Sequence, residues 1–210
     1  MTLVCFAVKE EAAPFRKIAA NRSDVQILLT GIGRENSERA VRTAVARRKP
    51  GLVLTCGFAG GLNPELALGT VVFSADASPE IAARLRAAGA RPARFHCAAR
   101  VATTAAEKQE LRRATGADAV EMESQAIHAV CREHGLSSAT VRVISDTADE
   151  DLPLDFNRVA KPDLSLDYGR LALAIAKSPG SIPALLRLRK NCRSSAERLA
   201  EVLSKIIWSK

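Results

Sequence analysis

Three carboxylates occupy comparable places in this sequence, each shortly after an apolar segment that predicts a buried strand. Glu11, Glu123 and Asp146 are far apart along the chain, and no histidine accompanies them at these places. An oxocarbenium-like transition state is stabilised by nearby negative charge, and its leaving group needs a proton donor. Carboxylates also accept hydrogen bonds from sugar hydroxyls. The three residues together therefore predict chemistry on a sugar.

Another carboxylate, Glu121, stands two residues before Glu123 in the stretch VEMESQAIHAV. An ionised carboxylate is expensive to bury alone, so it finds a partner or becomes neutral. For Glu121 two interpretations stay open: contact with a ligand, and an ordinary hydrogen-bonded carboxylate at the end of a strand. Glu150 and Asp151 are explained as part of a solvated loop. Glu10 is explained by the first turn of a helix, where the helix dipole favours an acidic residue.

Glycines follow the second and third predicted strands, in the stretches TGIG and CGFAGGL. Because glycine has no side chain, the backbone there can approach a ligand closely, and a helix that begins after it can hold an anion. Tight-turn geometry explains the same residues without any ligand. Both interpretations stay open for Gly31, Gly33, Gly57, Gly60 and Gly61.

Short apolar segments alternate with amphipathic ones along the chain, which predicts an α/β protein with a mainly parallel sheet covered by helices on both faces. Ligands of such a sheet bind beyond the carboxyl ends of the strands, where the three carboxylates fall. No linker divides the sequence, so we expect residues 1–210 to form a single domain. Strands are predicted at 2–8, 25–30, 51–56, 69–75, 117–122 and 139–144, with an extended piece near 94–102 and a loop over 149–163. Helices are predicted at 10–20, 34–48, 79–88, 105–114, 124–134, 166–177 and 182–207.

Composition argues against several classes of protein. The five cysteines follow no metal-ligand spacing, so we expect reduced thiols in a cytoplasmic protein and no metal. The apolar start TLVCFAV is too short for a signal peptide, and no run reaches the roughly 20 apolar residues of a membrane span. The net charge is +8, but only 4% of the residues are aromatic, and no nucleic-acid-binding motif is present. We therefore expect no nucleic-acid partner.

Four segments together resemble the nucleoside phosphorylase/nucleosidase superfamily of the purine phosphorylase type, which includes methylthioadenosine/S-adenosylhomocysteine nucleosidase. They are TGIG, CGFAGGL, AVEMESQAIHAVC and VRVISDTAD. The resemblance implies a single three-layer αβα domain with a mixed, mainly parallel central sheet. It also implies a homodimer that cleaves the N-glycosidic bond of a purine nucleoside without a cofactor, with inorganic phosphate left open as a co-substrate. A noncatalytic nucleoside-binding module is the alternative, because fold does not imply function.

The resemblance implies roles for individual residues. Asp146 would hydrogen-bond to or protonate the purine at N7, as a carboxylic acid kept neutral by a dry pocket. Glu123 would bind the ribose hydroxyls with Met122 packed under the sugar, and Glu11 would activate the attacking water. Further substrate contacts are expected from Glu121, Gly57, Phe58, Ser145, Gly33 and Arg34.

The chain departs from the phosphorylases of this superfamily at the phosphate site. Their G-D-P-x-R stretch is replaced by AVKEEAAPF, and residues 52–54 are Leu, Val and Leu where an arginine would enter the strand. Arg34 is the remaining candidate for contact with an anion. Glu11 therefore suits water better than phosphate, although both nucleophiles stay open. The aromatic residue that the nucleosidases place near adenine has no clear counterpart in VATTAAEK.

The segment LDYGRLALAIAKSPGSIPALLRLRKNCRSSAERLAEVL resembles the end of the hopanoid-associated phosphorylases. Those enzymes are implicated in removing adenine from adenosylhopane, so the expected substrate is a lipid-linked nucleoside. The alternatives are a methylthioadenosine/S-adenosylhomocysteine-type nucleosidase and a purine nucleoside phosphorylase. Over 182–207 leucines and basic residues interleave at helical spacing, and Trp208 follows. This predicts a helix packed on the sheet with a solvated basic face, or a peripheral contact with the inner membrane surface.

Overall fold

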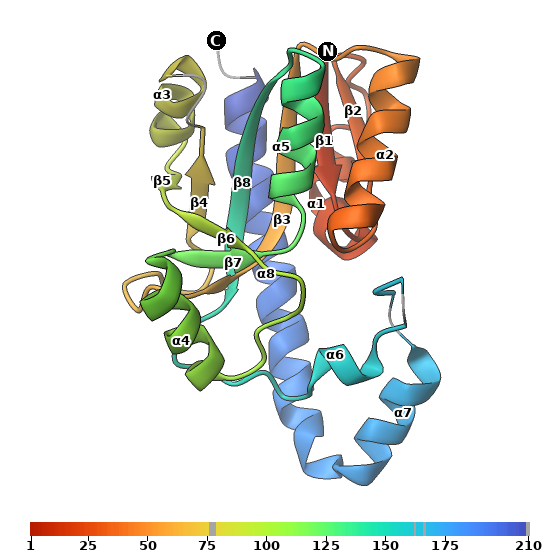
Figure 1. Ribbon diagram of the computed structural model, residues 1–210, viewed down its shortest axis with the longest axis vertical. Helices are drawn as coiled ribbons and strands as arrows, with labels where there is room; N and C mark the ends of the chain where they lie inside the picture. The colour runs from red at the N-terminus through yellow and green to blue at the C-terminus, as the bar shows by residue number, and fades with distance from the viewer. Residues whose placement is uncertain (76–78, 162, 166, 209–210) are drawn as a thin grey trace.

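The computed structural model describes residues 1–75, 79–161, 163–165 and 167–208 (Figure 1). The strands are β1 (Thr2–Phe6), β2 (Val25–Leu29), β3 (Leu52–Gly61), β4 (Val71–Ser74), β5 (Arg91–Pro92), β6 (Phe95–Cys97), β7 (Ala119–Glu121) and β8 (Ser137–Asp146). The α-helices are α1 (Lys9–Ile18), α2 (Arg34–Arg47), α3 (Pro79–Ala87), α4 (Ala105–Thr115), α5 (Ser124–Glu133), α6 (Phe156–Val159), α7 (Tyr168–Lys177) and α8 (Ile182–Trp208). A short 3₁₀ helix, η1 (Pro179–Ser181), joins α7 to α8.

These strands belong to one mixed sheet. Its main path runs β2-β1-β3-β8-β4-β5, while β7 pairs with the end of β3 and β6 pairs with β7. The pairs β1–β2, β1–β3 and β3–β8 are parallel, whereas β4 runs antiparallel to β8. The carboxyl ends of β1, β3 and β8 therefore meet at one edge of the sheet. The predicted α/β fold with a mixed, mainly parallel sheet is confirmed.

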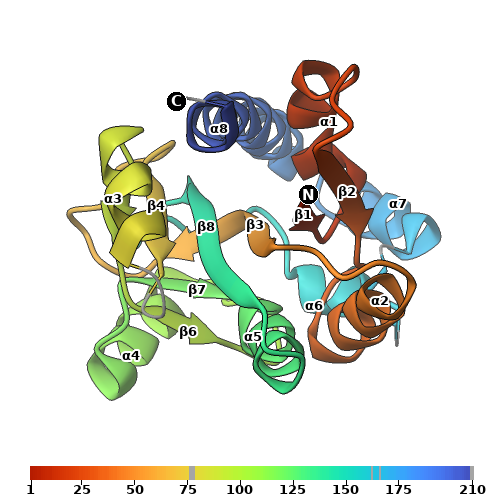
Figure 2. The ribbon, with the colours of Figure 1, turned by 90° about the horizontal axis from the view of Figure 1, so that it is seen from above.

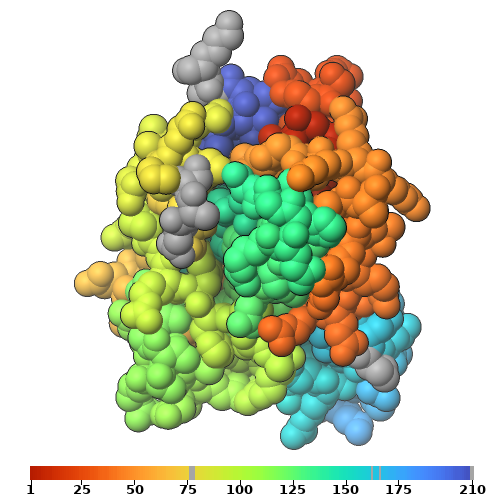
Figure 3. Space-filling model, turned by 45° about the horizontal axis from the view of Figure 1, so that its top comes forward, coloured from red at the N-terminus to blue at the C-terminus, as the bar shows by residue number. Residues whose placement is uncertain are grey.

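Helices cover both faces of the sheet. Side chains alternate across a strand, so Leu3 and Cys5 of β1 pack with α2 and α5, whereas Val4 and Phe6 pack with α1 and α8. Figure 2 shows α1 and α8 on one face and α2 and α5 on the other, and Figure 3 shows α5 beside α2 at the outer surface. The three layers are those that the resemblance implies.

The third strand is longer than the sequence predicts. The stretch GFAGGL was expected to be a loop, but β3 continues to Gly61 and pairs with β8 until the register shifts between Ala59 and Gly60. Glycines weaken a strand interior. Here, however, β3 is paired with β8 on one side, and on the other side with β1 and then, at its end, with β7. These hydrogen-bonded partners keep it extended. The shifted register sets Gly60 opposite Asp146. The end of β3 is thereby brought to the edge where the carboxylates lie.

Capping residues fix both ends of α4. The Thr104 hydroxyl accepts a hydrogen bond from the Glu107 N–H at 3.2 Å, and the Glu107 carboxylate accepts one from the Thr104 N–H at 3.3 Å. Gly116 ends the helix in the left-handed conformation, with φ of 65°. Such caps satisfy backbone groups that a helix end leaves unpaired. So fixed, α4 carries Lys108 into the interior, where its side chain is fully buried.

The region predicted as a loop over 149–163 contains one short helix, α6. Asp155 caps it by accepting a hydrogen bond from the Asn157 N–H at 3.1 Å. The next predicted helix, 166–177, corresponds to α7, which begins at Tyr168; its first predicted residue, 166, lies outside the described residues.

The last helix, α8, has two different halves. From Ser195 onward one side is buried against the sheet and α1, as the sequence predicts for a helix packed on the sheet. From Ile182 to Ser194 no side chain is buried. Trp208 stacks on Phe15 of α1, with ring centroids 5.7 Å apart and ring planes 9° apart. Trp208 therefore packs within the protein and does not end a free amphipathic surface.

Candidate active site

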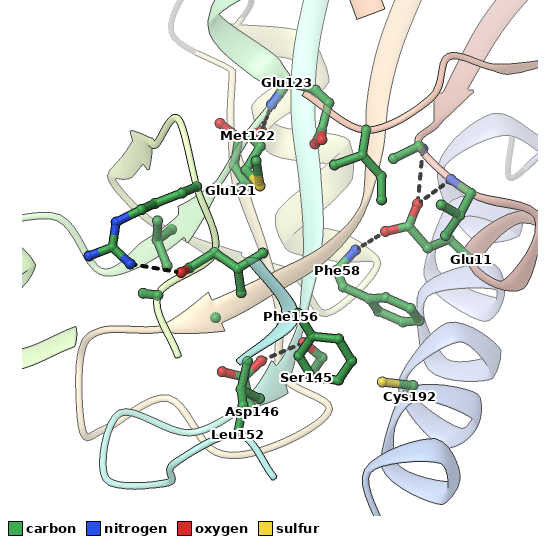
Figure 4. Close-up of a pocket in the computed structure, with 18 of the residues that line it drawn as sticks. Glu11, Phe58, Glu121, Met122, Glu123, Ser145, Asp146, Leu152, Phe156 and Cys192 are labelled. Atoms are coloured by element: carbon green, nitrogen blue, oxygen red, sulfur yellow. Dashed lines mark hydrogen bonds between the residues drawn. The ribbon is translucent and has the colours of Figure 1, made fainter. Parts of the chain in front are cut away.

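A cavity of about 270 Å³ lies at the carboxyl ends of β1, β3 and β8. Glu11, Glu123 and Asp146 all line it (Figure 4). Each of the three side chains is buried, with only a small part of its surface exposed. The structure therefore brings together the carboxylates that the sequence placed on three distant segments.

Backbone N–H groups hold Glu11 at one wall of the cavity. One of its oxygens accepts from the N–H groups of Ala7 and Val8 at 2.9 and 3.2 Å, and the other accepts from the N–H of Phe58 at 2.8 Å. Burial raises the pKa of Glu11 to about 7, although Arg142 and these hydrogen bonds act in the opposite direction. A carboxyl group with such a pKa is suited to take a proton near neutral pH.

Two glycines of β3 leave room for these carboxylates. A Cβ atom added at Gly57 would lie 2.5 Å from Oε1 of Glu11 and 2.8 Å from a guanidinium nitrogen of Arg142. Gly57 also has φ of +146°, which side chains disfavour. A Cβ atom at Gly60 would lie 3.3 Å from Oδ2 of Asp146. Close approach of backbone to carboxylate, and not a tight turn, explains these two glycines.

The partner of Glu121 and Glu123 is Arg142, a buried residue of β8. Its Nη2 atom donates to Oε2 of Glu121 at 2.7 Å and to Oε2 of Glu123 at 3.0 Å. It also donates to Oγ1 of Thr55 at 3.2 Å. The sequence analysis assigned a ligand as the partner of Glu123 and did not consider Arg142. That assignment is incomplete, because a guanidinium already compensates both carboxylates inside the protein.

One guanidinium is thus surrounded by more carboxylates than it can neutralise. Although burial opposes it, Arg142 and the hydrogen bonds from Ser124 hold the pKa of Glu121 below its usual value. Burial raises the pKa of Glu123, and the neighbouring Glu121 adds to this effect. Glu121 therefore carries the structural charge of the pair. Glu123 keeps acceptor capacity toward the cavity, since its second oxygen accepts only from the Gly33 N–H, at 2.9 Å.

Asp146 has a cationic partner of its own. Oδ2 of Asp146 lies 2.6 Å from Nζ of Lys108, and Oδ1 accepts from the Ser145 hydroxyl at 2.7 Å. Lys108 also donates to the carbonyl groups of Thr147 and Glu150 at 2.7 and 2.8 Å. The sequence analysis did not include this buried ammonium, and the role of Asp146 as a neutral acid stays a prediction.

The other predicted site residues divide into three groups. Phe58, Met122 and Ser145 line the cavity. Glu121 also lines the cavity, and its carboxylate accepts hydrogen bonds from Arg142 and Ser124. Gly33 and Gly57 are not among the lining residues: the Gly33 N–H donates to Glu123, and Gly57 leaves room for Glu11. Arg34 is not brought to the cavity: it is exposed and donates to the side chain of Gln125 at 3.0 Å. The predicted anion contact by Arg34 is therefore not supported by the geometry.

Sequence reasoning missed the two buried cations and one wall of the cavity. Arg142 is a single basic residue in the apolar run ATVRVIS. A lone charged residue inside a buried strand needs a buried partner of opposite charge, so its position could have predicted the contact with the glutamates. Lys108 lies among several charged residues of α4 and gave no signal. The missed wall is apolar and comes from the segment after β8 and from α6 and α8: Leu152, Phe156, Leu188 and Cys192. Within the described residues no cluster of three His, Cys, Asp or Glu side chains is placed to hold a metal ion.

The sequence matches the Phosphorylase superfamily over residues 5–97 and 75–166. The chain belongs to the phosphorylase superfamily. The predicted family is confirmed, and so is the expectation that the chain is an enzyme acting on an N-glycosidic bond. Within the superfamily, the chain is similar to the 5′-methylthioadenosine/S-adenosylhomocysteine nucleosidase of Shewanella halifaxensis, with 25% identity over 168 residues, 64% of this chain and 73% of the relative. The nucleosidase of the same name from Anoxybacillus flavithermus is 26% identical over 203 residues, 72% of this chain and 88% of the relative.

Two solved structures share the fold of this chain. The futalosine hydrolase of Helicobacter pylori superposes with a TM-score of 0.73 at 16% identity, covering 98% of this chain and 96% of that one. A Neisseria meningitidis 5′-methylthioadenosine/S-adenosylhomocysteine nucleosidase in complex with methylthio-immucillin-A gives 0.71 at 19% identity, covering 100% and 99%. At these identities the likeness establishes the fold.

Proposed function

We propose that this protein cleaves the N-glycosidic bond of a purine nucleoside and releases the base. The observation that carries the proposal is the meeting of Glu11, Glu123 and Asp146, from three distant segments, in one cavity at the carboxyl edge of the sheet. Membership in the phosphorylase superfamily and the similarity to proteins named as nucleosidases support it. The proposed reaction needs help for the leaving base, contacts to the sugar and an activated nucleophile, and each carboxylate takes one of these tasks.

Asp146 assists departure of the base. A purine leaves more easily when a proton is placed on N7 as the glycosidic bond breaks. Lys108 stands behind Asp146, with Nζ 2.6 Å from Oδ2. Asp146 in its acid form passes its proton to N7, and the carboxylate that remains is stabilised by the ammonium group of Lys108. The Ser145 hydroxyl fixes the orientation of the carboxyl group.

Glu123 binds the sugar, and Glu11 prepares the nucleophile. Glu123 accepts hydrogen bonds from ribose hydroxyls, with Met122 and Phe58 forming apolar surfaces nearby. Glu11, with a pKa of about 7, removes a proton from water as it attacks the sugar carbon. Water is favoured over phosphate because Arg142 is engaged with Glu121 and Glu123, and the exposed Arg100 at the cavity is paired with Glu107.

The direct test is to incubate the protein with purine nucleosides, with and without phosphate, and to separate the products by chromatography. We expect free base and free sugar, at a rate that does not depend on phosphate. Formation of a sugar phosphate would overturn the choice of water. Asp146→Asn should lower base release by about 10²–10⁴-fold while nucleoside still binds, and Asp149→Asn, an exposed neighbour, should not. Absence of base release from every purine nucleoside, or full activity of Asp146→Asn, would contradict the proposal.

The finer part of the proposal concerns the substrate, for which we propose adenine as the base and an apolar group at the 5′ position. The apolar wall formed by Leu152, Phe156, Leu188 and Cys192 supports this. A lipid-linked nucleoside such as adenosylhopane fits that description, and so does the short thioether of 5′-methylthioadenosine. The rates of 5′-alkylthioadenosines of increasing chain length separate the two. A rise in kcat/KM with chain length favours the lipid, and a fall beyond the methyl group favours the thioether.

A further inference from the structure

Residues 168–194 form a helical hairpin made of α7, η1 and the first half of α8, which we call the basic hairpin. It projects from the body of the protein beside α6 (Figure 1). None of its side chains is buried. Yet large apolar side chains lie open on it, namely Tyr168, Leu173, Ile182 and Leu186. Apolar groups gathered on an otherwise unburied element indicate a surface that binds something.

The same hairpin is strongly basic. It contains six basic residues and no acidic residue, while the whole chain has a net charge of +8. Among the described residues, the hairpin's basic side chains have three acidic partners outside it. Arg187 lies 4.0 Å from Glu150, Arg170 lies 3.6 Å from Asp167, and Arg193 pairs with Glu197. Exposed pairs of this kind contribute little. The basic hairpin therefore attracts a partner that is anionic and also accepts apolar side chains.

We propose that the basic hairpin docks on the surface of an anionic lipid bilayer. Amphipathic helices bind there by burying apolar side chains at the boundary between headgroups and acyl chains, while cations contact anionic lipids. A second copy of the chain is a poorer partner. If two copies paired through their basic hairpins, the six cations of one hairpin would face the same six cations of the other and repel them. A nucleic acid would match the charge but leave the leucines exposed. The bilayer satisfies both properties at once.

The position of the cavity agrees with this placement. Leu188 and Cys192 of the basic hairpin line the cavity, and Phe156 of the neighbouring α6 does so too. Docking would hold the apolar cavity wall close to the lipid. One of the two interpretations of the C-terminal helix set Trp208 at a membrane surface, but Trp208 stacks on Phe15 at the other end of α8. Among the described residues no single helix is long and apolar enough to cross a membrane, and only α7 and η1–α8 as a pair, bent by 104°, satisfy the criteria of length and composition.

The test is flotation of the full-length protein with vesicles of phosphatidylcholine alone and of phosphatidylcholine mixed with phosphatidylglycerol. We expect binding to the mixed vesicles, weakened by added salt. Leu173→Ser with Leu186→Ser should weaken it by roughly tenfold or more, because two leucines are lost from the interface. Arg189→Glu with Lys190→Glu should weaken it by roughly thirtyfold or more, because each basic residue near the surface contributes about 1 kcal/mol.

Matched controls lie elsewhere on the surface. Arg48→Glu with Lys49→Glu reverses two exposed basic residues after α2, and Ile18→Ser with Leu68→Ser replaces two exposed apolar residues. Both controls should bind vesicles like the unmodified protein. The proposal would be overturned if the protein bound no vesicles, or bound neutral and anionic vesicles equally. It would also be overturned if the control variants lost as much vesicle binding as the hairpin variants. A preference for a single-stranded oligonucleotide, or dimers that the hairpin variants abolish, would overturn it too. Because none of the replaced residues lines the cavity, cleavage of a water-soluble nucleoside should be unchanged in all variants, which keeps this test separate from that of the proposed function.

Discussion

Arg142 stands at the centre of a group of buried carboxylates whose pKa values differ in direction. Glu121, Glu123 and Glu11 each interact with its guanidinium. The pKa of Glu121 is lowered, while burial raises the pKa of Glu11 and of Glu123. Three glutamates thus acquire different pKa values from their surroundings. One site can therefore hold a carboxylate that stays ionised, Glu121, beside one that can act as a base near neutral pH, Glu11.

The raised pKa of Glu11 leads to a prediction about pH. If the ionised form activates water, kcat/KM should increase with pH up to about 7 and level off above it. The effect on stability has the opposite sign. Protonated Glu11 is favoured in the fold, so its contribution is present below its ordinary pKa of 4.5 and is lost as pH rises through about 7. Glu11→Gln should remove both dependences and lower kcat by about 10²–10⁴-fold, as pH–rate profiles and denaturant titrations at several pH values would show. A Glu11→Gln protein with the full rate and an unchanged profile would exclude this role.

Lys108 allows a prediction that separates structure from catalysis. Lys108→Met leaves Asp146 and the carbonyl groups of Thr147 and Glu150 without their buried partner, so unfolding should become easier by roughly 3–5 kcal/mol. The rate should also fall, mainly in kcat, because the cation that stabilises the Asp146 carboxylate after proton transfer is lost. Adding Asp146→Asn removes the unpaired charge and should restore part of the stability but none of the activity. Unchanged kcat in Lys108→Met would show that the ammonium only anchors the loop.

At the scale of elements, β3 sets the geometry of the cavity. Its glycines lie in the strand itself and leave the space that Glu11 and Asp146 fill. Gly57→Ala should displace Glu11 or Arg142, lower the stability by about 1–3 kcal/mol and reduce activity strongly. Gly51→Ala is the matched control, because its added Cβ atom would lie 4.0 Å from its nearest neighbour. Thermal unfolding and the nucleoside assay measure both effects. Equal behaviour of the two variants would show that Gly57 has no such part in the site.

Much of this arrangement could be predicted from the sequence, because it follows from local pattern. Apolar segments fixed the sheet, and the rule that ligands bind at the carboxyl ends of strands selected the three carboxylates. The long reach of β3 could not be predicted, since its glycines favour a loop locally and only pairing with neighbouring strands keeps it extended. Lys108 was missed for a similar reason. Its burial depends on how α4 packs, and charged neighbours in sequence conceal it.

At the scale of the whole molecule, the two ends of the chain meet. α8 packs on α1, and Trp208 stacks on Phe15. Trp208→Ala should remove this contact and lower the stability by about 3 kcal/mol, as for other truncated aromatic residues. Trp208→Phe should keep most of it. Denaturant unfolding of both variants gives the comparison, and a Trp208→Ala protein as stable as the original would mean that the stack contributes nothing. The homodimer implied by the family resemblance stays a prediction, and the mass of the protein in solution tests it.

The participation of α8 in the cavity wall has a consequence for biosynthesis. The three carboxylates of the proposed site are all made within the first 146 residues, but Leu188 and Cys192 come later. The buried turns of α8 that anchor these two residues to the sheet come later still. A nascent chain on the ribosome therefore holds every acidic group of its site before it can close the pocket around a nucleoside. Turnover should begin only once the final helix has emerged from the exit tunnel and docked.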